Sequence, residues 1–197
     1  MKILVATNNK GKLREIKEIL TGPNIEIVTP GETGLILEVD EDGVTFTENA
    51  VKKAESWCKA SGMNVLADDS GLCVEALNGA PGIRSARFAG DNSNDKDNIK
   101  LLLERLLGIE NRNAKFVCVM ALALTDGRVL TAQGECHGEI TQTPSGSTGF
   151  GYDPVFLFTP KGKTFAEIEQ DEKNRISHRR HALEALKEQL TVLDSIY

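Results

Sequence analysis

An apolar run meets two adjacent carboxylates in the stretch Val65-Leu66-Ala67-Asp68-Asp69-Ser70-Gly71. The run from Val65 to Ala67 is typical of a buried strand, and we expect that strand to end at the acids, where Gly71 would reverse the chain. Ligand crevices in open α/β sheets form at the carboxyl ends of strands, and paired carboxylates there suit a hard cation such as Mg²⁺. A surface turn is the alternative, because Asp, Ser and Gly are all turn residues.

The N-terminal segment predicts a strand, a polar loop and a helix. Ile3 to Ala6 is a short apolar strand, and Leu13, Ile16 and Leu20 lie on one helical face. The loop between them consists of Thr7, Asn8, Asn9, Lys10, Gly11 and Lys12. Its hydroxyl, its lysines and the N–H groups of the helix N-terminus can converge on a phosphate. The order of a P-loop and the GxGxxG pattern are both absent, so a polar loop with an Asn turn stays open as the alternative.

Further patterns extend this α/β reading along the chain. Residues 25–28 and 72–76 read as strands, residues 99–107 as a helix, and residues 116–124 and 129–140 as a hairpin. The sequence Thr45-x-x-Glu48 is a capping box, and it opens a helix with an inward stripe formed by Phe46, Ala50, Ala54 and Trp57. A final helix is expected from Ser177, with its inward face formed by Leu183, Leu186, Leu190 and Leu193.

Composition limits the possible classes of function. The chain has 197 residues, 40% of them hydrophobic, which fits one compact domain. A net charge of −6 argues against a nucleic-acid-binding surface, because such a surface is basic. The four cysteines have no metal-binding spacing and are expected to be free thiols. With no apolar stretch of signal-peptide or membrane-span length, we expect a cytoplasmic protein that does not bind membranes.

Three clusters carry candidate chemistry. Glu41 and Asp69 can supply carboxylate oxygens to Mg²⁺ with Asp68 as a helper, although Glu41 would look the same in a solvated acidic loop. The glycine-rich loop Phe150-Gly151-Tyr152-Asp153 can present an aromatic face to a nucleobase, unless its rings only fill the core. The third cluster is a set of donors at a helix N-terminus, which are Lys173, His178 and Arg179. Cations at that end of a helix oppose the helix dipole and so suggest a ligand. A plain salt bridge of Arg179 is the alternative.

The assembled motifs resemble the inosine triphosphate pyrophosphatase family in its bacterial form. The resemblance runs nearly end to end in six motifs, which are Ala6 to Lys12, Thr45 to Ala50, Ala67 to Leu72, Gly79 to Ile83, Gly149 to Pro154 and Ile176 to Arg179. It implies an α/β fold with an elongated mixed sheet and flanking helices, in which residues 1–197 form one ITPase-like domain with two lobes around a cleft. It also implies a homodimer.

The resemblance implies a role for each motif. The loop from Thr7 to Lys12 and Ser70 would bind the triphosphate, with Lys53 also reaching the phosphates. Asp69 would be the general base and a metal ligand, and Glu41 would share the metal. The base and sugar would be held by Phe150, Gly151, Tyr152, Asp153, Lys173, His178 and Arg179. Arg180 departs from the small residue that many relatives carry there, which puts the fine base preference in doubt.

The implied activity is Mg²⁺-dependent hydrolysis of the purine nucleotides dITP, ITP and XTP to the monophosphate and pyrophosphate. A Maf-type pyrophosphatase, acting on modified or pyrimidine nucleotides, is the nearest alternative. The motifs Ser177-His178-Arg179 and Phe150-Gly151-Tyr152-Asp153 argue against it. A nucleotide sensor without turnover is the other alternative, and the intact pair of acids argues against that one.

Overall fold

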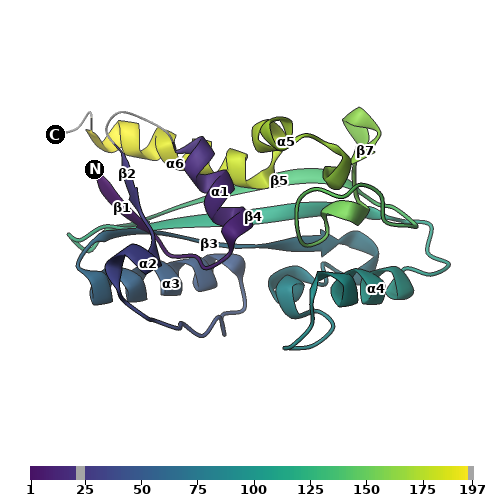
Figure 1. Cartoon of the computed structure of the whole chain (residues 1–197), viewed down its shortest axis with the longest axis horizontal. Helices are drawn as coiled ribbons and strands as arrows, with labels where there is room; N and C mark the ends of the chain where they lie inside the picture. Colours follow the sequence, from purple (N-terminus) through teal and green to yellow (C-terminus); the bar gives the residue numbers. More distant parts are fainter. Residues whose placement is uncertain (21–24, 195–197) are drawn as a thin grey trace. The chain divides into compact units, whose positions relative to one another are not determined.

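A seven-stranded mixed sheet with flanking helices forms the framework of the molecule (Figure 1). The computed structural model describes residues 1–20 and 25–194, with side chains as far as residue 191. The sheet order is β2-β1-β3-β4-β5-β6-β7. The strands are β1 (Lys2–Val5), β2 (Glu26–Val28), β3 (Asn64–Val74), β4 (Asn113–Ala123), β5 (Val129–Ile140), β6 (Phe156–Phe158) and β7 (Lys163–Thr164). Strand β1 runs parallel to β2 and β3, whereas β6 is antiparallel to β5 and β7.

The helices differ widely in length. The α-helices are α1 (Lys10–Ile19), α2 (Pro30–Thr33), α3 (Phe46–Ser61), α4 (Asp95–Arg105), α5 (Gln170–Ile176) and α6 (His178–Asp194). The 3₁₀ turns are η1 (Glu75–Leu77), η2 (Gly82–Arg87), η3 (Asp153–Val155), η4 (Thr159–Lys161) and η5 (Phe165–Glu167). Within the described part of the chain, none of the helices has the length and apolar character that a membrane span requires.

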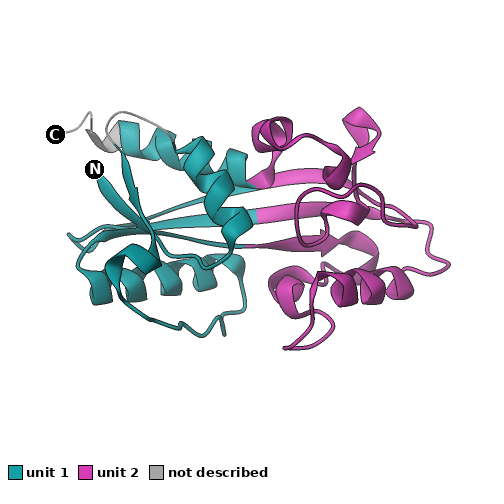
Figure 2. Ribbon diagram, in the orientation of Figure 1, with its two compact units in different colours: residues 1–69, 118–134, 179–197 teal, residues 70–117, 135–178 magenta. Residues whose placement is uncertain are grey.

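The chain divides into two compact units (Figure 2). Unit 1 consists of residues 1–69, 118–134 and 179–197, and unit 2 consists of residues 70–117 and 135–178. Each unit has its own set of buried apolar residues.

Unit 1 has a core on each face of its part of the sheet. Helices α1 and α6 cover one face and α3 covers the other (Figure 1). Successive residues of β1 alternate between these cores: Ile3 and Val5 pack with α1 and α6, and Leu4 packs with α3. A strand buried on both faces must be apolar throughout, which explains the unbroken apolar run at the N-terminus.

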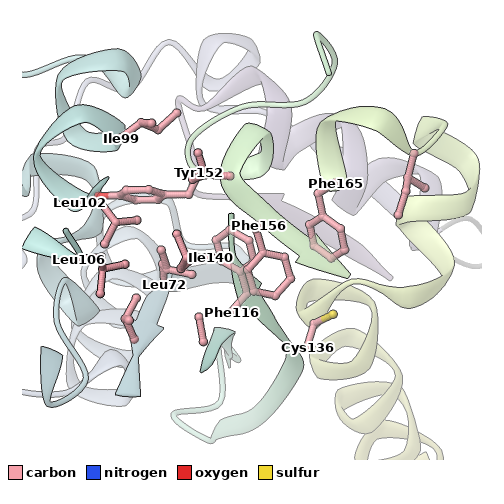
Figure 3. Packing of buried hydrophobic residues seen from close by; sticks show 14 residues of the cluster. Leu72, Ile99, Leu102, Leu106, Phe116, Cys136, Ile140, Tyr152, Phe156 and Phe165 are labelled. Atoms are coloured by element: carbon pink, nitrogen blue, oxygen red, sulfur yellow. The ribbon is translucent and has the colours of Figure 1, made fainter. Parts of the chain in front are cut away.

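Unit 2 is centred on a cluster of aromatic rings (Figure 3). The rings of Phe116 and Phe156 are 4.6 Å apart between centroids, and those of Phe156 and Phe165 are 4.9 Å apart, both tilted. Tilted pairs at this separation are favourable beyond the area they bury. Leu72 from β3 and Leu102 from α4 are fully buried in the same cluster.

Several predictions about local structure are confirmed. The hairpin is formed by β4 and β5, and Thr45 caps α3 by accepting a hydrogen bond from the N–H of Glu48 at 3.1 Å. The carboxylate of Glu48 accepts from the N–H of Val44 at 2.7 Å, one residue before the position that a regular capping box uses. All four cysteines are free thiols. The expected inward position of Leu193 lies outside the described side chains.

The predicted chain reversal at the acidic pair is wrong. Strand β3 continues without a break from Asn64 to Val74, so Asp68 and Asp69 lie inside it and Gly71 does not reverse the chain. Buried charges inside a strand need compensating partners, and helices contribute them for both acids. Strand β1 does have its carboxyl end beside the acidic pair, because it ends at Val5, which pairs with Leu66 of β3. The short elements α5, β6 and β7 were not predicted, because two to seven residues carry too little periodicity.

The aromatic cluster yields a prediction about stability. Phe156 is fully buried against Phe116 and Phe165, so Phe156→Ala should remove apolar burial and leave a cavity. We expect a free energy of unfolding lower by about 3–5 kcal/mol in urea titrations. The neighbouring Phe158 is only half-buried at the edge of the cluster, so Phe158→Ala should cost clearly less. Equal losses for both variants would contradict the central place of Phe156.

Candidate functional site

The adjacent acids of β3 point to opposite faces of the sheet. Side chains alternate along a strand, and Leu66 and Ala67 already belong to different cores. The carboxylate of Asp68 contacts Lys12 of α1 and Arg179 of α6, whereas that of Asp69 contacts Asn49 of α3. The two acids therefore sit in separate surroundings within unit 1.

Asp68 lies in a buried cluster of charges. Its Oδ2 atom is 2.8 Å from Lys12 Nζ and 3.7 Å from Arg179 Nη2. Arg179 also forms an ion pair with Glu15 of α1, and the side chains of Glu15, Asp68 and Arg179 are each 1% exposed. This cluster ties the first and last helices of the chain to β3.

The cluster keeps Asp68 ionised. Burial alone would raise the pKa of Asp68, but the charges of Lys12 and Arg179 outweigh it and hold the pKa well below its usual range. Burial likewise opposes the charge of Arg179, yet Glu15 and Asp68 raise the pKa of its guanidinium. A permanently anionic Asp68 can orient Lys12, but it is a poor proton acceptor.

Asp69 lies among groups from α3 and the preceding loop. Its Oδ2 atom accepts a hydrogen bond of 2.9 Å from Nδ2 of Asn49. Glu41 forms an ion pair with Lys53 of α3, and Lys53 Nζ also donates to the backbone oxygen of Asp68 at 2.9 Å. A cavity of about 360 Å³ adjoins this group and is lined by Ala6, Thr7, Asn8, Leu37, Glu38, Val39, Asp40, Glu41, Lys53 and Trp57.

The electrostatics of this second group differ from those around Asp68. Burial raises the pKa of Asp69, the hydrogen bond from Asn49 lowers it, the charge of Glu41 raises it, and the net shift is upward. Burial opposes the charge of Lys53, but Asp68 and Glu41 raise its pKa overall. A carboxyl group with a raised pKa accepts protons more readily than an ordinary aspartate, which suits a general base.

The three acids predicted to bind a metal are not brought together. Glu41 and Asp69 belong to the α3 side of β3, and Asp68 points to the α1 side. Among the described side chains, no three His, Cys, Asp or Glu groups form a cluster that could hold a metal ion. Of the three predicted acids, Glu41 and Asp69 therefore form the pair that lies on the α3 side.

The predicted phosphate loop joins β1 to α1. Asn9 is the N-cap of α1, and its Oδ1 atom accepts from the N–H groups of Gly11 and Lys12 at 2.9 and 3.1 Å. Two of the helix N-terminal donors are thus already satisfied by Asn9. Lys10 is exposed, and Thr7 and Asn8 line the cavity described above.

In unit 2, the glycine-rich loop closes around a carboxylate. Asp153 Oδ2 accepts from the N–H of Phe150 at 2.8 Å and is 2.6 Å from the buried Nζ of Lys173. That Nζ atom lies 4.8 Å from the centroid of the Phe150 ring, within the range of a cation–π contact. Gly151 donates its N–H to Asp95 of α4 at 2.7 Å. Asp153 and Lys173 therefore hold the loop and its aromatic ring.

Two other residues of the predicted base site are buried in unit 2. Tyr152 is part of the aromatic core and its hydroxyl donates to the backbone oxygen of Ser85 at 2.9 Å, as the core-filling alternative predicted. His178 stacks on Phe116 with centroids 4.8 Å apart. Ser70, the first residue of unit 2, is partly exposed. The predicted contacts of these residues with a ligand stay predictions.

Sequence reasoning missed two polar residues in unit 1, Glu15 and Asn49. Each lies on the buried stripe of its helix, Glu15 beside Ile16 and Asn49 beside Ala50. A polar side chain on an otherwise apolar helical face was the available signal, because such a residue is buried only with a partner. For Arg179 the structure shows the ion pair that the alternative interpretation proposed.

Comparisons with known proteins identify the family of the chain. The sequence profile of the Ham1 family matches residues 3–189. The chain is 47% identical to a dITP/XTP pyrophosphatase of Clostridium tetani, and the match covers 95% of each chain. It is 44% identical to a dITP/XTP pyrophosphatase of Bacillus subtilis, and that match covers 95% of this chain and 96% of the relative. Two solved structures are similar over 98% of this chain and 99% of theirs. One is the Ham1 protein of Staphylococcus aureus, with a TM-score of 0.88 and 42% identity. The other is a HAM1 protein of Coxiella burnetii, with a TM-score of 0.89 and 41% identity.

The buried charge cluster yields a prediction about Arg179. Arg179→Met should leave the buried carboxylates of Glu15 and Asp68 without a compensating guanidinium. We expect the free energy of unfolding in urea titrations to fall by about 3–5 kcal/mol, the usual cost of breaking a buried pair.

The adjacent Arg180 is the matched control for this variant. It forms a partly exposed pair with Glu184 one helical turn away, so Arg180→Met should change the free energy of unfolding by only about 0–1 kcal/mol. Similar small losses for both arginine variants would show that the cluster does not depend on Arg179.

Proposed function

Because this chain belongs to the Ham1 family, we propose that it hydrolyses dITP, ITP and XTP to the monophosphate and pyrophosphate, and so removes non-standard purine nucleotides from the nucleotide pool. The supporting observation is the asymmetry of the acidic pair in β3. Asp68 is held as an anion among cations, whereas Asp69 has a raised pKa and lies near Glu41 and Lys53. One carboxylate thus suits positioning of a lysine, and the other suits proton transfer.

We propose that the reaction uses Mg²⁺, held by Glu41 and Asp69. Nucleotide hydrolases generally require a divalent metal ion, and Mg²⁺ is usually bound by one or two carboxylates together with substrate phosphates. The two acids fit this requirement, because both supply hard oxygen donors on the α3 side of β3. When bound, the ion would neutralise phosphate charge and make a water more acidic. Asp68 is left out of this set because it faces Lys12.

In the proposed mechanism, Asp69 takes a proton from a water molecule. The oxygen of that water forms a bond to the α-phosphorus, and the bond from the α-phosphorus to its bridging oxygen breaks. Pyrophosphate leaves with the bonding electron pair. Lys12 and Lys53 would stabilise the negative charge that develops on the departing group, with Lys12 held in place by Asp68.

The remaining candidate residues would bind the rest of the substrate. We propose that the loop from Thr7 to Lys12 and Ser70 bind the triphosphate, and that the Phe150–Asp153 loop, Lys173, His178 and Arg179 hold the base and sugar. The ring of Phe150, fixed by Lys173 and Asp153, supports stacking of a planar base. We also propose a cytoplasmic homodimer, and light scattering of the purified protein would test the dimer.

A substrate panel tests the proposed activity. With Mg²⁺, we expect pyrophosphate release from ITP, dITP and XTP to exceed release from ATP, GTP, dTTP and modified pyrimidine triphosphates, and EDTA to abolish it. A preference for pyrimidine or modified nucleotides would favour a Maf-type activity. Tight nucleotide binding without pyrophosphate release would favour a sensor. Full activity in EDTA would refute the metal requirement.

A further prediction concerns Asp69. Asp69→Asn preserves the size of the side chain and leaves an amide oxygen to accept from Asn49, so the fold should persist. An amide cannot take the proton, and kcat should fall by far more than about tenfold, equivalent to ~1.4 kcal/mol of barrier. Asp42→Asn is the control, because Asp42 lies in the acidic loop but is exposed and pairs with Lys52. A variant at Asp69 that keeps more than about a tenth of kcat would remove it from the mechanism.

A further inference from the structure

We propose that Asn49 is a positioning residue that sets the carboxylate of Asp69 and the Glu41 loop relative to one another. The inference rests on the proposed function, since it concerns the two acids proposed to hold the metal ion. All of the groups involved belong to unit 1.

Asn49 forms a bridge with both ends of its side-chain amide. Its Nδ2 atom donates to Asp69 Oδ2 at 2.9 Å, and its Oδ1 atom accepts from the N–H of Gly43 at 2.8 Å. The side chain is almost fully buried, because Asn49 is only 1% exposed. A carboxylate can only accept and a backbone N–H can only donate, so a flipped amide would lose both bonds. The orientation of Asn49 is therefore defined by its two partners.

The backbone at Gly43 is pressed closely against Asn49. A Cβ atom at Gly43 would lie 2.7 Å from Asn49 Oδ1 and 2.8 Å from the Cβ atom of Glu48. The next residue, Val44, donates its N–H to the carboxylate of Glu48 at 2.7 Å. The loop is thus fixed to the first turn of α3 only two residues after Glu41.

These contacts link the two proposed metal ligands. Glu41 has no strand or helix of its own to hold it, because residues 35–43 form an irregular segment. Asn49 supplies a rigid connection, since it is buried in a helix and bonds to both the loop and Asp69. Acids that share a cation need a defined separation, and the residues behind them commonly provide it. Loss of Asn49 should therefore impair the use of the metal ion more than nucleotide binding.

Asn98 in unit 2 provides a matched control. It occupies the fourth position of α4, as Asn49 does in α3. It is also buried, its Oδ1 atom accepts from the N–H of Ala89 at 2.8 Å, and its Nδ2 atom donates to the backbone oxygen of Ala86 at 3.1 Å. The hydroxyl of Ser93 also donates to its Oδ1 atom at 2.9 Å, and no carboxylate takes part in these three bonds. Asn98→Ala therefore reproduces the structural loss without touching Asp69.

The experiment compares Asn49→Ala with Asn98→Ala in the full chain. We expect both variants to lower the melting temperature by similar amounts. Only Asn49→Ala should lower kcat for ITP, by more than about tenfold, with KM changed by less than about threefold. Calorimetry with a non-hydrolysable α,β-bridged ITP analogue should show that Asn49→Ala weakens Mg²⁺ binding, whereas Asn98→Ala leaves it unchanged.

A second variant covers the case in which Asn49→Ala does not fold. Asn49→Asp keeps an acceptor for the N–H of Gly43 but loses the donor to Asp69, so kcat should fall although the loop contact is retained. Wild-type kcat and Mg²⁺ affinity in folded Asn49 variants would overturn the inference. If the wild-type protein hydrolyses none of the nucleotides, the proposed function fails, and the Mg²⁺ titrations still decide whether Asn49 organises the cation site.

Discussion

Successive side chains of a strand face opposite sides of the sheet, and in β3 two successive side chains are buried carboxylates. Each must be compensated on its own face. Lys12 and Arg179 do so for Asp68, and Asn49 does so for Asp69. The partners of Asp68 come from the first and last helices of the chain. The packing of α1 and α6 and the placement of the candidate site therefore both depend on Lys12 and Arg179.

The pKa values of the two acids shift in opposite directions because their partners differ. Cations surround Asp68 and lower its pKa, whereas Asp69 has a neutral amide as its hydrogen-bond partner and a raised pKa. Buried ion pairs contribute little net stability, since desolvation offsets most of the attraction. The value of the Asp68 cluster is therefore better explained by the position it gives to Lys12 than by stability.

In unit 2 a buried acid likewise orients a lysine, here beside an aromatic ring. A Cβ atom at Gly149 would lie 2.0 Å from Asp153 Oδ2, and the φ angle of Gly149 is +79°, so only glycine fits this position. The close approach lets the loop fold around the carboxylate, which in turn holds Lys173 near the face of Phe150. In both units a buried acid orients a lysine at a candidate binding group, and the cost of burying the acid is offset by that pairing.

Local patterns were sufficient for much of the fold. The strand and helix at the N-terminus, the cap at Thr45, the β4–β5 hairpin and the start of α6 follow from periodicity and capping chemistry, which act over a few neighbouring residues. The motifs also indicated the family and the candidate residues. The continuity of β3 through Asp68 and Asp69 could not be predicted this way, because it depends on charges contributed by residues 12 and 179.

By itself, the sequence therefore determined the α/β character, the family and the identity of the acidic pair. The tertiary structure alone decided which acid pairs with Lys12 and Arg179 and which faces the Glu41 loop, and it alone revealed Glu15 and Asn49 as their supports. The physical reason is that the pKa and orientation of a buried carboxylate depend on the groups within a few ångströms of it. In this fold those groups come from helices far away along the chain.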